Sequence, residues 1–262
     1  MCIAAFPLGA CHGTARPAPP RGFVALFNGR NLSGWRGLPG DPPKVAKMNP
    51  IERADAQRAA DARMRQHWRV TSDGILAFDG QGDNLCTARN YADFQLLVDW
   101  RIPKGGDSGI YLRGNPQVQI WDKAPVAPVA AVAAQAASAP NDSQAGSGGL
   151  YNNQHHRSTP LVVADLPPGQ WNAFDIQLVG DRVTVHLNGA LVVDDTPIEN
   201  YWQRGQPFPL RGSIELQAHG GPLEFRNIFI REIRPGRRGG KTMIPTAQPA
   251  ATAPTTTAKA HG

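Results

Sequence analysis

Alternation of apolar and polar residues is the feature that most restricts how this chain can fold. The longest such run is residues 94–102, in which Phe, Leu, Val, Trp and Ile occupy every second position. Successive side chains of a strand point to opposite faces of a sheet, so this run predicts a strand with one face in a core. Similar short runs recur from residue 67 to residue 231. The Asn188-Gly189 pair between two of them is typical of a β-hairpin.

These runs indicate an all-β fold, a β-sandwich or jelly roll. About a dozen strands with turns every ~8–12 residues are typical of sandwiches and jelly rolls. One helix is expected within residues 44–67, because Asn49 suits the N-cap, Pro50 the first turn and Glu52 a capping box. Its apolar residues are mostly Ala, so we predict one surface helix, inserted between strands over residues 49–66.

Three segments are expected along the chain. Residues 22–233 form the jelly-roll domain, between an N-terminal segment, residues 1–21, and a disordered tail, residues 234–262. Within the domain, residues 123–147 are rich in Ala, Val, Pro and Ser, which predicts a long flexible loop.

The basic charge of the chain does not indicate a nucleic-acid partner. The formal net charge is +6, but four basic residues of the C-terminal tail account for most of it. No basic stripe lies on a predicted strand, so nucleic-acid binding is excluded as an interpretation.

Residues 8–11, Leu-Gly-Ala-Cys, are similar to the lipobox of bacterial lipoproteins, whose cysteine is lipidated after the export signal is cleaved. Only ten residues precede Cys11 and none is basic, which is too short for an ordinary signal. We therefore expect a truncated signal and a Pro-rich tether, and an exported protein that is periplasmic or anchored to the membrane through Cys11. A chance match is the alternative. No transmembrane helix is predicted.

Residues 105–122 combine strand alternation with side chains suited to sugars. Tyr111 and Arg113 are expected on one face of the first half, and Gln117, Gln119 and Trp121 on one face of the second. A sugar's hydroxyls need forked hydrogen-bond donors and acceptors, which such groups provide, and its C–H faces stack on aromatic rings. This face is therefore predicted to bind substrate, although structural packing is the alternative for each side chain.

Residues 212–219 offer a second polar face with Glu215, Gln217 and His219 at alternate positions. A strand rise of ~3.3 Å places Glu215 and His219 some ~13 Å apart, so they flank a sugar ring rather than touch. An ordinary solvated sheet face is the alternative. Asp107 is a sugar or metal ligand, or a turn acid.

Three further residues are candidates near these faces. Tyr151 and Asn152 follow two glycines, and either lie over the binding face or turn the chain. Asp122 either serves as a metal ligand or base, or caps the next loop. Asp107, Asp122 and Glu215 are the candidate ligands of a divalent metal ion, and no other cofactor is expected.

Several motifs, in order, resemble the 3-keto-disaccharide hydrolase domain family, whose fold is a concanavalin A-like (LamG-like) jelly roll. Many members carry Glu where Gln117 stands, so no acid is expected there. The matching stretches, which together span residues 22–233, are residues 27–35, 94–100, 106–113, 117–122, 169–172, 183–194 and 215–220.

The resemblance implies a hydrolase that cleaves 3-keto-glycosides. A ketone at C3 acidifies the C2–H, so a base can remove that proton, the C1 oxygen can leave, and water can add back. Glu215 or His219 would be the base, and Arg113 or a divalent ion would stabilise the enolate. A conventional glycosidase needs two paired acids, and Glu215 has no obvious partner. The alternative is a non-catalytic, lectin-like carbohydrate-binding module.

Overall fold

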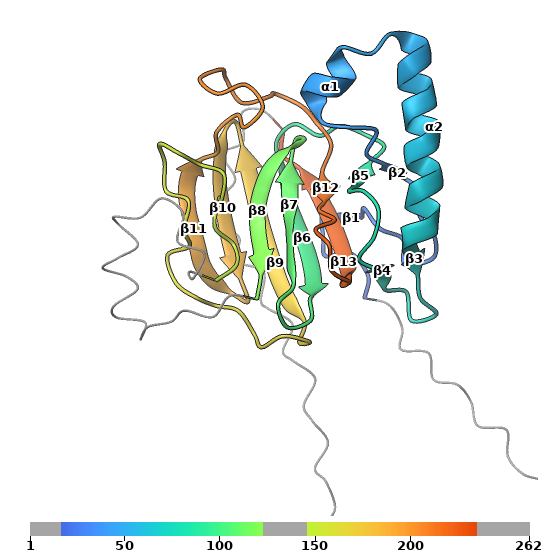
Figure 1. Cartoon of the computed structure of the whole chain (residues 1–262). Coiled ribbons are helices and arrows are strands. Elements are labelled where there is room, and N and C mark those ends of the chain that lie inside the picture. The colour runs from blue at the N-terminus through green and yellow to red at the C-terminus, as the bar shows by residue number, and fades with distance from the viewer. Residues whose placement is uncertain (1–16, 123–145, 235–262) are drawn as a thin grey trace, which may run out of the picture.

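Two antiparallel sheets pack face to face in the computed structural model, which describes residues 17–122 and 146–234 (Figure 1). This arrangement confirms the predicted β-sandwich. The large sheet contains β1 (Val24–Ala25), β3 (Trp68–Val70), β4 (Leu76–Phe78), β6 (Phe94–Arg101), β9 (Asn172–Val179), β10 (Arg182–Leu187), β11 (Ala190–Pro197) and β13 (Leu223–Glu232). The small sheet contains β2 (Trp35–Gly37), β5 (Leu85–Thr87), β7 (Asp107–Leu112), β8 (Asn115–Trp121) and β12 (Glu215–Leu216).

Neighbouring strands in each sheet are mostly distant in sequence. The order of the large sheet is β11-β10-β9-β6-β13-β4-β3, with β1 also paired to β13, and that of the small sheet is β2-β5-β12-β7-β8. The β10–β11 hairpin turns at Asn188 and Gly189, whose φ angles of 51° and 86° are typical of a tight hairpin turn.

The core lies between the two sheets, as the alternation predicts. From the large sheet, β6 contributes Phe94 and Trp100, which are 0% and 2% exposed. From the small sheet, Ile110, Val118 and Leu216 lie in one cross-strand row and are fully buried. On each small-sheet strand, the residues next to these buried ones in sequence therefore point outward, away from the core.

The inserted helix is confirmed as α2 (Pro50–His67), with the complete capping box of Asn49 and Glu52. Its buried residues are Ala60 and Met64, so it is a surface helix. A second short helix, α1 (Pro42–Ala46), was not predicted as a separate element. Figure 1 shows both helices on the same side of the sandwich, and α2 contacts β2.

Two boundaries differ from those expected from the sequence. Residues 146 and 147 belong to the structured domain rather than to the predicted loop, because Ser147 is fully buried and bonds to Trp121. Beyond it, Gly148 and Gly149 exchange backbone hydrogen bonds with Gln119, which covers the edge of β8. The strand predicted over residues 212–219 is shortened to β12.

Several expectations fall outside the described residues. They are the lipobox with Cys11, residues 123–145 of the predicted loop, and the tail beyond residue 234. Within the described ranges, no helix is long and apolar enough to cross a membrane.

Candidate active site on the small sheet

The outer face of the small sheet carries three rows of mainly polar side chains. Residues paired across neighbouring strands point to the same face of a sheet. In the first row, Arg36 pairs with Cys86, Cys86 with Glu215, and Glu215 with Tyr111. This row crosses four strands and brings the predicted Glu215 next to the predicted Tyr111.

The second and third rows complete the face. Gln217 donates its backbone N–H to Gly109, and Gly109 pairs with Gln119, so Gly109 lies between two glutamines. In the third row, Asp107 pairs with Trp121. The two polar faces predicted separately from the sequence are therefore one continuous surface, because β12 lies beside β7.

Asp107 and His219 form a pair at the rim of this surface. The Nδ1 atom of His219 lies 3.5 Å from Oδ2 of Asp107, and their side chains are 58% and 30% exposed. Gln119 donates from Nε2 to the other carboxylate oxygen of Asp107 at 2.8 Å. A carboxylate at Nδ1 orients the imidazole and leaves Nε2 to exchange a proton with a ligand.

Glu215 differs from Asp107 because it is almost completely buried, with 2% exposure. The hydroxyl of Ser213 donates to Oε1 at 3.0 Å, and Nδ2 of Asn84 donates to Oε2 at 3.4 Å. Burial raises the pKa of Glu215 to about 7, and the two hydrogen bonds oppose that rise. Its carboxyl group is therefore partly protonated at neutral pH.

Tyr111 supplies a neutral hydroxyl on the same row. Burial, followed by the nearby charge of Glu215, raises the pKa of Tyr111 to about 12. Nε2 of Gln217 lies 3.4 Å from the Tyr111 hydroxyl and donates to it. The Asn84 side chain is a second hydrogen-bond neighbour of this hydroxyl, which can both donate and accept.

Asn84 and Arg36 are site residues that the sequence analysis missed. Oδ1 of Asn84 accepts the backbone N–H of Ala218 at 2.9 Å, which fixes the amide group toward Glu215. Arg36 follows the buried Trp35, so strand alternation gave a signal that it points outward. Nothing local in the sequence shows that β5 lies beside β12, so the role of Asn84 had no such signal.

The prediction that Arg113 shares a face with Tyr111 is wrong. The β7–β8 pairing shifts register after Ile110, and Arg113 has a left-handed φ of 54°, so the expected alternation breaks. Its guanidinium, only 1% exposed, donates to the carboxylate of Asp93 at 2.6 Å. It also donates to the carbonyl oxygens of residues 92, 180 and 209. Arg113 therefore ties loops together and does not face the site.

Tyr151 packs against Trp121 at the end of the third row. Their rings form an edge-to-face pair with centroids 5.2 Å apart, and Nε1 of Trp121 donates to the carbonyl of Gly146 at 2.7 Å. Trp121 is 6% exposed, whereas Tyr151 is 37% exposed and Asn152 is half-buried. The segment that carries Tyr151 and Asn152 is thus beside the face, at the Trp121 end.

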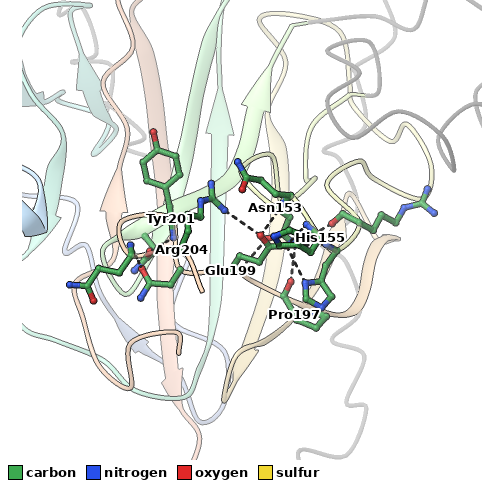
Figure 2. A network of polar contacts seen from close by, with 12 residues as sticks. Asn153, His155, Pro197, Glu199, Tyr201 and Arg204 are labelled. Atoms are coloured by element: carbon green, nitrogen blue, oxygen red, sulfur yellow. Dashed lines mark hydrogen bonds and ion pairs between the residues drawn. The ribbon is translucent and has the colours of Figure 1, made fainter. Parts of the chain in front are cut away.

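A polar network around Glu199 holds this segment (Figure 2). The Glu199 carboxylate accepts the backbone N–H groups of Gln154, His155 and His156, and its other contacts include Arg204. Burial opposes ionisation, but the three N–H donors outweigh it and lower the pKa of Glu199 to about 2. The carboxylate therefore stays charged and fixes the loop after Tyr151.

The three predicted metal ligands do not converge. Asp107 contacts His219, Asp122 accepts the backbone N–H of Gly105 at 2.8 Å, and Glu215 is bound by Ser213. Among residues 17–122 and 146–234, no group of three or more His, Cys, Asp or Glu side chains is arranged to hold a metal ion. The residues present thus do not fit the divalent site expected from the sequence.

Comparisons with known proteins agree with this fold. The sequence model of a family described as "3-keto-alpha-glucoside-1,2-lyase-like domain" matches residues 22–231. A protein of Bacteroides thetaiotaomicron named 3-keto-disaccharide hydrolase is 24% identical over 260 residues, which cover 82% of this chain and 80% of that protein.

Two crystal structures from Parabacteroides distasonis, both described as candidate glycosyl hydrolases, are also similar. One has a TM-score of 0.58 at 21% identity and covers 81% of this chain and 95% of its own. The other has a TM-score of 0.56 at 24% identity and covers 88% of this chain and 100% of its own. At these identities, the likeness establishes the fold.

Proposed function

The chain belongs to the family of 3-keto-alpha-glucoside-1,2-lyase-like domains, and on this premise we propose that it cleaves the glycosidic bond of 3-keto-glycosides. The name of the Bacteroides relative, 3-keto-disaccharide hydrolase, supports this substrate class. The polar and aromatic side chains on the outer face of the small sheet support a carbohydrate ligand.

His219 is the general base in this proposal. It is exposed, and the Asp107 carboxylate lies near Nδ1, so Nε2 can accept the C2 proton of a bound sugar. Glu215 is less suited to this step, because it is 2% exposed and both of its oxygens already accept hydrogen bonds. Of the two bases left open by the sequence, His219 therefore has the better access to substrate.

Tyr111 stabilises the negative charge that forms on the C3 oxygen. Its pKa of about 12 keeps the hydroxyl protonated, and its oxygen accepts from the Gln217 amide, which leaves the hydroxyl able to donate to a ligand. A neutral hydroxyl donor in a partly buried site can hold an enolate oxygen without needing a cation. This role replaces the one that the sequence analysis gave to Arg113.

The reaction divides into elimination and hydration. The C2–H bond breaks as its proton moves to Nε2 of His219, and the electron pair forms the enolate. The enolate electrons then form the C1–C2 double bond as the C1–O bond breaks, and the imidazolium proton passes to the departing oxygen. Water adds its hydroxyl to C1 and a proton to C2, so the sum is hydrolysis.

The pairing of His219 with Asp107 on the sugar-binding surface is the observation that carries this proposal. The test is release of the aglycone from an aryl 3-keto-glucoside, compared with the same glucoside bearing a C3 hydroxyl. We expect release only from the keto compound, and a loss on the order of 100-fold or more in His219→Ala. Binding of both sugars without release from either would instead support the lectin-like alternative.

We also propose that the protein is exported and anchored through Cys11, as the lipobox-like stretch suggests. Mass spectrometry of the membrane fraction of the native host tests this directly. A diacylglyceryl modification on Cys11 is the expected result, and an unmodified protein confined to the soluble fraction contradicts it.

A further inference from the structure

Buried polar atoms without a hydrogen-bond partner concentrate on the candidate site. In the described part of the chain, four side-chain atoms are of this kind: Trp100 Nε1, Arg36 Nε, Gln117 Oε1 and Gln217 Oε1. Trp100 faces the core, but the other three lie on the outer face of the small sheet. Two of those three are amide oxygens, which accept hydrogen bonds and cannot donate them. Unpartnered buried acceptors are rare in folded proteins, and their clustering here points to a ligand.

The orientation of the Gln117 amide follows from a chain of hydrogen bonds that ends at Asp107. A carboxylate accepts only, so Gln119 must turn Nε2 toward Asp107 and present Oε1 on its other side. Gln117 must then donate from Nε2 to Oε1 of Gln119. Oε1 of Gln117 is thereby left as an acceptor without a protein partner.

Gly109 leaves space for the Gln117 amide to form these hydrogen bonds. A Cβ atom at position 109 would lie 2.7 Å from Cδ of Gln117 and 3.1 Å from its Nε2. The Gln117 side chain therefore lies across β7, over the backbone of Gly109. On the other side of Gly109, Gln217 bonds to its carbonyl oxygen through the backbone.

Gln217 contacts Tyr111 through its amide group. Its Nε2 donates to the Tyr111 hydroxyl, and its Oε1, on the other side of the amide group, has no partner. The face thus offers a hydroxyl donor from Tyr111 together with acceptor oxygens from Gln117 and Gln217.

We propose that Gln117 and Gln217 determine specificity by accepting hydrogen bonds from the hydroxyls on C2 and C4, which flank the C3 carbonyl. This inference rests on the proposed function. A ketone has no proton to donate, so it matches Tyr111, whereas the two neighbouring hydroxyls match the two amide oxygens. The site therefore selects sugars in which both carbons next to the ketone carry a free hydroxyl.

The test pairs protein variants with substrate analogues. Aryl 3-keto-glucosides lacking the hydroxyl at C2, C4 or C6 are compared with the parent compound in wild type, Gln117→Met and Gln217→Met. Binding of the corresponding methyl glucosides and their deoxy analogues is measured by calorimetry on the same proteins. The C6 analogue is the matched control, since neither amide is assigned to that hydroxyl.

Wild type should lose about tenfold in kcat/KM and in affinity for both the C2 and C4 analogues. Each Met variant should lose its discrimination against one of these two analogues and retain its discrimination against the other. Gly109→Ala should act as Gln117→Met does, since its methyl group displaces the Gln117 amide without removing it. This variant and Gln217→Met preserve the test if Gln117→Met does not fold.

The outcomes separate the inference from the proposed function. Turnover of the parent with equal discrimination in wild type and all variants overturns the inference and leaves the function in place. Discrimination in binding that the variants abolish, without turnover of any keto compound, overturns the function and supports the inference. Failure to bind or cleave any of these sugars overturns both.

Discussion

Nδ1 of His219, which follows β12, lies 3.5 Å from Oδ2 of Asp107, the first residue of β7. Gln119 holds the second oxygen of the same carboxylate. The imidazole is therefore oriented by a carboxylate that is itself fixed by an amide. This arrangement gives an exposed proton acceptor a defined direction on a face suited to sugars.

Replacing Asp107 by Asn should reduce kcat for 3-keto-glucoside cleavage on the order of 100-fold or more, because the imidazole loses its orienting charge. Asp122→Asn is the matched control, since Asp122 is close in sequence to the site but bonds to Gly105. Steady-state kinetics on the purified variants provide the measurement. Equal losses in the two variants would contradict the assigned role of Asp107.

Glu215→Gln should flatten the dependence of the free energy of unfolding on pH. The folded-state pKa of Glu215, about 7, exceeds the ordinary model value of 4.5. The contribution of protonated Glu215 to the free energy of unfolding is therefore complete below about pH 4.5. It is lost as the pH rises through 7, and the loss is up to about 3 kcal/mol. Urea titrations between pH 4.5 and 8 measure this, and an unchanged slope in the variant would contradict the burial argument.

Arg113→Met should destabilise the fold by roughly 3 kcal/mol, because it removes the buried cation that pairs with Asp93 and the side-chain donor to three loop carbonyls. Arg101→Met is the control: its partly exposed ion pair with Glu224 contributes about 1 kcal/mol or less. Denaturant unfolding gives both values. If Arg113→Met instead raised KM with unchanged stability, the assignment of Arg113 to the loops would be wrong.

Glu199→Ala should loosen the loop that follows Tyr151 while the sandwich stays folded. Three backbone N–H groups lose their acceptor, so hydrogen exchange over residues 154–156 should become faster (Figure 2). Glu232→Ala, which removes an exposed partner of Arg89, serves as the control. Unchanged protection of residues 154–156 would show that the network does not hold the loop.

Local patterns were sufficient to predict much of the fold. Alternation placed Phe94 and Trp100 in the core, and the capping box of Asn49 and Glu52 located the start of α2. Both signals act over a few residues. The order of the strands could not be obtained in this way, since β12 lies between β5 and β7 although it follows both by many residues.

In the candidate site too, local patterns predicted some features, whereas others depend on how the strands pair. Tyr111, Gln119 and Glu215 share a face as alternation predicted within each strand. Arg113 does not, because one register shift and one left-handed residue reverse its direction. Asn84 and the contact between Asp107 and His219 depend on strand pairing, so no local pattern indicated them.

The central claim is that the C2 proton is removed before the glycosidic bond breaks. The most direct test compares aglycone release from an aryl 3-keto-glucoside carrying hydrogen at C2 with release from the same compound carrying deuterium there. The account predicts a primary isotope effect on kcat/KM and no release from the glucoside with a C3 hydroxyl. Equal rates for the two isotopologues, together with cleavage of the unoxidised glucoside, would contradict it.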